Sequence, residues 1–181
     1  MNRNILSIIW MLLFFAFGSE AQAATASTSA TATIVAPVGI GFLNDLDFGT
    51  IVPGATQTGT VTVNPATGAR TPAGGVTLVN SLYGAALFNI TGSPSTSNNT
   101  SRFHINLPVR ITIRNTANTN ITMMVDIFTS DLQQNGNNGV YTGTFDGTGS
   151  ASFHVGGTLN VGINQAPGAY SGIFTVDVHN N

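Results

Sequence analysis

Cysteine is absent from the 181-residue chain. A protein without thiols forms no disulfide bonds, offers no thiolate to a metal ion, attaches no c-type haem and has no cysteine nucleophile. Its folded state must therefore be stabilised by its own hydrophobic core or by partner chains.

Charged side chains are also scarce. The chain has no lysine and a single glutamate, Glu20, and its net charge is −2. The lack of lysine excludes a phosphate-binding P-loop and Schiff-base chemistry, and no basic stripe of the kind that binds nucleic acid is present. Because 42% of the residues are hydrophobic, disorder is not expected. The sequence predicts a folded domain whose solvated faces consist of Thr, Ser, Asn and Gly.

Helical periodicity is missing after residue 23, so we expect almost no helix there. Short alternating runs are separated instead by turn residues such as Pro53-Gly54, Asn135-Gly136 and Pro167-Gly168. The expected strands are residues 48–51, 59–63, 75–79, 85–91, 102–107, 110–114, 121–129, 140–145, 151–161 and 170–179. Strands at this spacing, without helices between them, predict an all-β fold, an antiparallel sandwich or barrel.

The first 23 residues have the pattern of a secretory signal peptide. Residues 5–18 form an apolar run after a weakly positive start, and Ala21-Gln22-Ala23 supplies the small residues that signal peptidase recognises. The alternative is a membrane anchor, but the run is shorter than the about 20 residues that span a bilayer. We therefore expect cleavage after Ala23, no membrane anchor after cleavage, and export to the periplasm, the cell surface or the medium.

Residues 24–36, which follow the expected cleavage site, alternate almost strictly. One face is apolar except for Thr28 and includes Ala26, Ala30, Ala32 and Ile34, whereas the other consists of threonine, serine and valine. Such alternation favours a strand. Its more apolar face consists of small side chains until Ile34.

Asp45 and Asp47 are the only closely spaced acidic pair. In an extended segment the two side chains share a face, where they would share a cation or a proton. The simpler interpretation is that they cap a turn and stay solvated, because no calcium-binding spacing accompanies them. We favour the turn.

His104, His154 and His179 are the only histidines, and each lies in a different expected strand. No short-spaced ligand pair exists, so we interpret them as separate strand histidines rather than metal ligands. No Gly-x-Ser-x-Gly elbow is present. The polar segments 93–101 and 130–139 are interpreted as hairpin ends. We expect a protein that is not an enzyme, with no catalytic residues, cofactor or metal site; an exported hydrolase that uses aspartates is the minor alternative.

Several motifs carry a resemblance to known families. The C-terminal runs Phe153-His154-Val155-Gly156-Gly157-Thr158-Leu159-Asn160-Val161 and residues 165–178, with a Pro-Gly turn, a tyrosine and a terminal alternating strand, resemble spore coat protein U and the archaic Csu-type fimbrial subunits. Together with Asp45-Leu46-Asp47-Phe48-Gly49, residues 60–63 and Arg70-Thr71-Pro72-Ala73-Gly74-Gly75-Val76, they are similar to a bacterial exported family of unknown function over nearly all of the chain after residue 23.

The fimbrial resemblance implies an immunoglobulin-like, pilin-like sandwich that lacks its final strand. A periplasmic chaperone would hold the gap open until the N-terminal extension of another subunit fills it, and an usher is the other implied partner. The resemblance therefore implies a structural or adhesive subunit of a surface fibre or coat. The alternative is a self-complete secreted module that binds a sugar or a protein through its loops. Residues 24–36 are a donated strand in the first case. In the second case they are the ordinary first strand of a self-contained sandwich and pair with residues 37–181 of the same chain. The sequence leaves both open.

The terminal strand has a predicted orientation. Period-two geometry buries Tyr170, Phe174, Val176 and Val178 and exposes the side chains between them, because a slip by one residue would bury Asp177 without a partner. The candidate residues for strand exchange are Ala26, Ala30, Ala32, Ile34, Tyr170, Phe174, Val176 and Val178.

Overall fold

Strands form where apolar and polar side chains alternate, because successive side chains of a strand point to opposite faces. In β3 (Gly59–Val63) the valines are fully buried, whereas the threonines are at least partly exposed. The computed structural model describes residues 29, 37–92, 102–136 and 139–180. Among these residues every regular element is a strand and every strand pair is antiparallel. The expected all-β antiparallel fold is confirmed.

Apart from Ser29, the described residues belong to one compact unit, Val35–Asn181. None of them belongs to a helix of the length and apolarity needed to cross a membrane.

The larger sheet has eight strands in the order β1-β6-β12-β9-β8-β13, with β3 paired to β12 and β4 paired to β3. Their bounds are β1 (Gly39–Asn44), β3 as above, β4 (Arg70–Gly74), β6 (Ala86–Thr91), β8 (Arg110–Asn115), β9 (Thr122–Ser130), β12 (Ser150–Val161) and β13 (Tyr170–Ser171). β12 holds the sheet together. Its first half pairs with β6 and its second half with β3, while β9 pairs along its other side.

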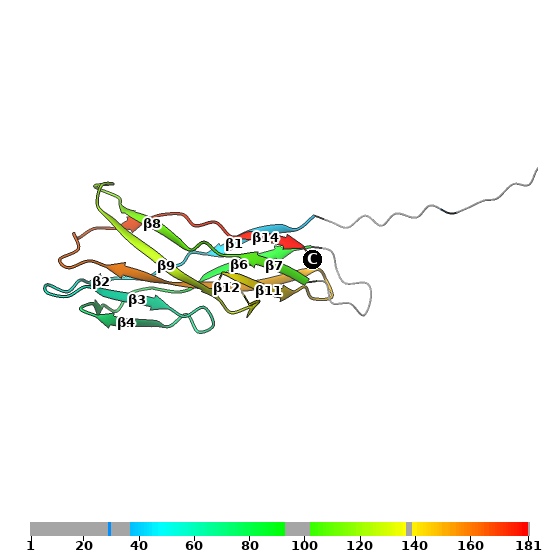
Figure 1. Cartoon of the computed structure of the whole chain (residues 1–181), viewed down its shortest axis with the longest axis horizontal. Helices are drawn as coiled ribbons and strands as arrows, with labels where there is room; N and C mark the ends of the chain where they lie inside the picture. The colour runs from blue at the N-terminus through cyan, green and yellow to red at the C-terminus, as the bar shows by residue number, and fades with distance from the viewer. Residues whose placement is uncertain (1–28, 30–36, 93–101, 137–138, 181) are drawn as a thin grey trace, which may run out of the picture. The chain divides into compact units, whose positions relative to one another are not determined.

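The smaller sheet contains β10 (Gln133–Gln134), β11 (Val140–Thr144), β7 (Arg102–Asn106) and β14 (Asp177–Asn180) in that order, and β2 (Ile51–Val52) pairs separately with β5 (Thr77–Leu78). Phe103 of β7 links the two larger sheets. Its ring centroid lies 6.4 Å from that of Phe153 on β12 and 4.9 Å from that of Phe145. All three rings belong to one buried core. The two sheets facing each other across this core form a β-sandwich (Figure 1).

The structure adds three strands that the sequence does not predict. All six residues of β1 are exposed, so no alternation marks that strand. β4 contains Pro72, and a proline usually argues against a strand. The proline is tolerated because β4 is an edge strand that pairs only with β3 among the described residues. β10 lies within the segment 130–139, which the sequence predicts as a hairpin end. The expected strands 48–51 and 75–79 shorten to β2 and β5.

The Asp-Leu-Asp-Phe-Gly and Arg-Thr-Pro motifs meet around Arg70. The Arg70 guanidinium donates from Nη1 to the Phe48 carbonyl and from Nη2 to the Val79 carbonyl, each at 2.8 Å, and it stacks 4.2 Å from the centre of the Tyr83 ring. Gly49 has a φ of 69°, and a Cβ there would lie 2.5 Å from Nη1. A glycine is therefore required beside the guanidinium. These motifs build a structural contact that ties β4 to the segments carrying β2 and β5.

Candidate functional site

Asp45 and Asp47 do not form a site in the structure. The Asp47 carboxylate accepts a hydrogen bond of 2.7 Å from the Gly49 backbone N–H, and the Asp47 backbone pairs with Gly84. Asp47 therefore caps a turn, as the simpler interpretation holds. Within the described ranges, no three His, Cys, Asp or Glu side chains come together in a way that could hold a metal ion.

Asp146 organises the turn between β11 and β12. One of its carboxylate oxygens accepts hydrogen bonds from the Thr148 hydroxyl at 2.7 Å, the Thr148 N–H at 2.9 Å and the Ser150 N–H at 2.8 Å. The Thr148 hydroxyl bond, followed by the backbone bonds, lowers the pKa of Asp146 below its ordinary value. This carboxylate is part of the local turn and faces solvent.

The three histidines fall into two groups. His154 on β12 is paired with Asp131, with Nδ1 2.8 Å from the carboxylate, and its backbone N–H donates to the same side chain. His104 and His179 lie directly opposite each other in the β7–β14 pair. The sequence could not place these two histidines opposite each other, because the register between distant strands is not visible in it.

The expected terminal strand, residues 170–179, divides into two. β13 pairs with β8 at one end of the larger sheet, and β14 pairs with β7 at one end of the smaller sheet. Residues 172–176 belong to neither strand. The prediction of a single continuous strand is therefore wrong, because the chain changes from the larger to the smaller sheet at residues 172–176.

The predicted orientation of this segment is nevertheless confirmed. Val176 is buried, and Tyr170, Phe174 and Val178 are partly buried, whereas the residues between them are exposed (Ile173, Thr175, Asp177 and His179). The Phe174 ring lies 5.1 Å from the Phe128 ring and 5.9 Å from the Phe88 ring, centroid to centroid. Phe174 therefore fills the space between the sheets while the chain crosses from one to the other.

Polar contacts fix the start of residues 170–178, the segment in which the chain crosses from one sheet to the other. The Tyr170 hydroxyl donates to the Ala166 carbonyl at 2.6 Å and accepts from the Gln165 amide at 2.9 Å. The buried Asn115 side chain donates to the Pro167 carbonyl at 3.2 Å and accepts from the N–H groups of Ala117 and Asn118. These bonds hold the Pro-Gly turn against the end of β8.

β1 is the most unusual surface of the described part of the chain. Ile40 lies opposite Ile90 of β6, and Phe42 lies opposite Phe88. Residues paired in this way project from the same face of a sheet. Ile90 is fully buried and the Phe88 ring stacks on Phe153, so this face points toward the core. Yet Ile40 is 43% exposed and Phe42 is 71% exposed.

The core side of β1 is therefore uncovered, and its second edge has no strand partner among the described residues. β1, Gly-Ile-Gly-Phe-Leu-Asn, carries no charged residue. Edge strands of soluble proteins are usually protected by charge, proline or a covering segment, and an unprotected apolar edge is a template for pairing. Sequence reasoning missed this surface because β1 has no polar side chain before Asn44, so polar and apolar side chains do not alternate along it. We call the exposed side chains Ile40, Phe42 and Leu43, with their backbone, the β1 edge.

Four of the predicted strand-exchange residues, Ala26, Ala30, Ala32 and Ile34, lie outside the described residues, as does the polar segment 93–101. The other four, Tyr170, Phe174, Val176 and Val178, belong to the segment that crosses between the sheets.

Two shallow hollows lie elsewhere on the surface. One of about 430 Å³ is lined mainly by backbone and small side chains of β3, β4 and β12 and contains no ionisable side chain. The other, of about 330 Å³, is lined by Arg102, Asp131 and several amide and hydroxyl side chains, among them Gln133 and Thr142. The second hollow is lined mainly by polar side chains.

One comparison with known protein families matches nearly all of this unit. Residues 38–179 match the family described as "Domain of unknown function (DUF4402)". No curated protein and no solved structure matches the chain. The matched residues begin immediately before β1 and end within β14, so they include the β1 edge, the Arg70 contact and the segment that crosses between the sheets. The chain belongs to the DUF4402 family.

Proposed function

We propose that the protein is a non-enzymatic structural or adhesive subunit of a bacterial surface fibre or coat, and that its copies assemble by β-strand addition. The observation that carries this proposal is the exposure of Ile40 and Phe42 on the core side of an edge strand that pairs with β6 and has no second strand partner among the described residues. A strand added at the β1 edge would pair with its free backbone groups and place alternate side chains over these two residues.

The proposed donor is residues 24–36 of a second copy. This segment is uncharged, and its small side chains at Ala26, Ala30 and Ala32 would allow a close approach, with Ile34 as the one large anchor. A strand with neither charge nor large apolar groups at most positions gains affinity mainly from its backbone hydrogen bonds. Until a donor arrives, the β1 edge needs protection from unwanted pairing, which is the task of a periplasmic chaperone and usher.

The sequence resemblance supports the same proposal. Spore coat protein U and the archaic Csu-type subunits, which the C-terminal motifs resemble, assemble through strands donated between subunits. Export, which the pattern of residues 1–23 predicts, would place the protein where such fibres are built.

A charge at the β1 edge tests the proposal. Phe42→Asp should abolish polymers of the purified chain in analytical ultracentrifugation and leave a folded monomer, because a carboxylate would be buried under the added strand. Val109→Asp is the matched control, since Val109 is 84% exposed in the turn between β7 and β8 and should leave assembly unchanged. Polymers of the Phe42→Asp variant that match the wild type in size and yield would contradict addition at this edge.

Deletion of residues 24–33 tests the donor. Loss of polymers with the fold intact supports donation to a neighbour, and loss of the fold in a monomer indicates an ordinary first strand. If neither stability nor assembly changes, the segment is not a donor.

The polar hollow beside Arg102 favours a second candidate function, a secreted module that binds a sugar or a peptide. In that case the chain is a stable monomer, and Gln133→Ala weakens binding to immobilised glycans or peptides without any effect on assembly.

A further inference from the structure

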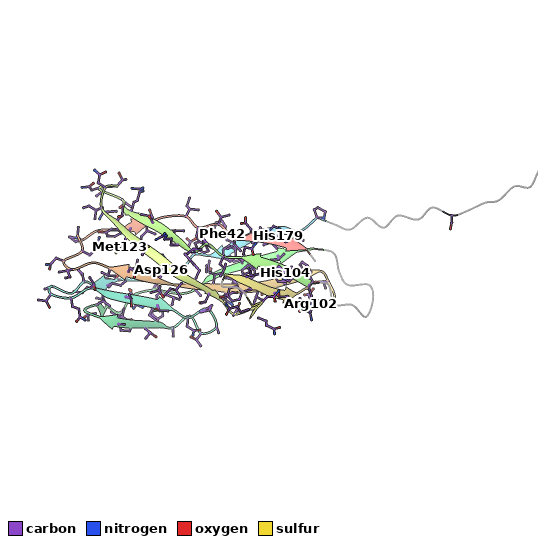
Figure 2. All side chains as sticks on the ribbon, in the orientation of Figure 1. Phe42, Arg102, His104, Met123, Asp126 and His179 are labelled. Atoms are coloured by element: carbon purple, nitrogen blue, oxygen red, sulfur yellow. The ribbon has the colours of Figure 1, made fainter. Side chains whose placement is uncertain are left out.

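A row of polar side chains crosses the outer face of the smaller sheet. His104 of β7 is paired with Thr142 of β11 on one side and with His179 of β14 on the other. The neighbours of His104 along the strand, Phe103 and Ile105, are fully buried, so His104 points away from the core. Figure 2 labels both histidines on neighbouring strands of this sheet.

Directly paired residues of antiparallel strands have Cβ atoms about 4.5–5.5 Å apart and project from one face. The two imidazoles therefore start from adjacent positions on the same surface. Two nitrogen ligands of a tetrahedral ion, each at about 2.1 Å, are separated by about 3.4 Å, which side chains of this length reach by rotation.

Thr142 orients the imidazole ring of His104 by a hydrogen bond. Its hydroxyl Oγ1 lies 2.9 Å from Nδ1 of His104. When Nδ1 carries the proton and donates to Oγ1, the lone pair of Nε2 is free for a metal ion, and the ring orientation is held by the hydrogen bond. His154 differs in its position, because it lies on β12 opposite Leu87 and not opposite a second histidine. His179 is exposed, so its ring is free to turn toward His104.

We propose that His104 and His179 together bind a divalent transition-metal ion, Zn²⁺, Cu²⁺ or Ni²⁺, on the outer face of the β7–β14 pair. Neutral imidazole is a preferred ligand of these ions, whereas Mg²⁺ and Ca²⁺ prefer oxygen ligands. No third His, Cys, Asp or Glu joins the pair within the described residues, so water fills the remaining coordination positions. Such a site is exchangeable rather than a permanent structural centre.

The ion would act as a clamp on the C-terminal strand. β14 is at the end of its sheet and pairs only with β7 among the described strands. A ligand that bridges β7 and β14 binds the attached strand more tightly than the detached one, so it shifts the equilibrium toward the attached state. This inference does not depend on the proposed function, because it concerns the two histidines and not the β1 edge.

Calorimetric titration of the folded chain with ZnCl₂ and with NiCl₂ tests the site. We expect one ion per chain, no binding of Mg²⁺ or Ca²⁺, and affinity at least about tenfold weaker in His104→Gln and in His179→Gln. Thr142→Val should weaken binding about tenfold, because it removes the bond that orients His104. His154→Gln is the control and should bind as the wild type does. Circular dichroism of each variant confirms the fold.

Hydrogen exchange supplies a second readout. Zn²⁺ should slow the exchange of the β14 backbone amides in the wild type and have no effect in His179→Gln. Wild-type affinity in His179→Gln, or loss of binding in His154→Gln alone, would overturn the proposed pair.

Discussion

Replacement of Arg70 by methionine tests whether the family motifs build a structural contact. The guanidinium makes two hydrogen bonds of 2.8 Å to the carbonyls of Phe48 and Val79. Bonds of this kind to a charged group contribute about 1.5–3 kcal/mol each, and the stacking on Tyr83 adds about 0.5–1 kcal/mol. The buried Nε has no partner, which costs about 1–3 kcal/mol in the wild type and is relieved by methionine. The net loss for Arg70→Met is then about 0.5–6 kcal/mol, with a central value of about 3 kcal/mol.

Urea unfolding followed by circular dichroism measures this loss as a lower midpoint at an unchanged slope. Arg114→Met is the matched control, because the exposed Arg114 guanidinium donates only to the Thr119 carbonyl within the described part of the chain. Its replacement should change the free energy of unfolding by about 0.5 kcal/mol or less. Arg70→Lys should recover at most part of the stability, since an ammonium cannot reproduce the planar fork. An Arg70→Met midpoint equal to the wild type would refute the argument.

Three further predictions concern other parts of the chain. Phe174→Ala should lower the free energy of unfolding by about 2–4 kcal/mol, which is less than the about 3–5 kcal/mol typical of a fully buried phenylalanine because Phe174 is partly exposed. A change within about 0.5 kcal/mol would mean that the ring contacts of Phe174 are absent. Since the pKa of Asp146 is lower in the folded state, its contribution is present above the ordinary pKa of 3.8 and is lost as the pH falls through the folded value, so Asp146→Asn should flatten the acid limb of the stability curve. Mass spectrometry of the exported protein should find Ala24 at or near the N-terminus, and an intact Met1 in the membrane fraction would contradict cleavage.

The sequence predicted the strands that have one buried and one solvated face. The limits of β3 agree with the expected residues 59–63, and β12 begins one residue before the expected 151–161. The alternation pattern did not identify strands that bury neither face, because nothing then requires polar and apolar residues to alternate. β1 is exposed throughout, and β4 accepts Pro72 at an edge.

The candidate surfaces were harder to predict than the strands. Burial alternates from Ile173 to Val178 across the change of sheets, because both sheets face the same core. The sequence pattern therefore gave the buried residues correctly and the strand boundaries incorrectly. The pairing of His104 with His179 depends on register between distant strands, which a single sequence does not contain.

The double pairing of β12 has a consequence for folding during synthesis. β3 and β6 both precede β12 by many residues, since Val63 pairs with Gly157 and Ala86 with Val155. At about 5–20 residues per second, a ribosome needs roughly 5–20 s to make the chain between Val63 and Gly157. Throughout that interval β3 has only its hairpin partner β4, and β6 has no partner on the side that β12 later occupies. The growing chain therefore depends on other molecules to shield its apolar strands until β12 has been made. Pairing of β12 with β3 and β6 is then slow, because contacts between residues far apart in the sequence form slowly.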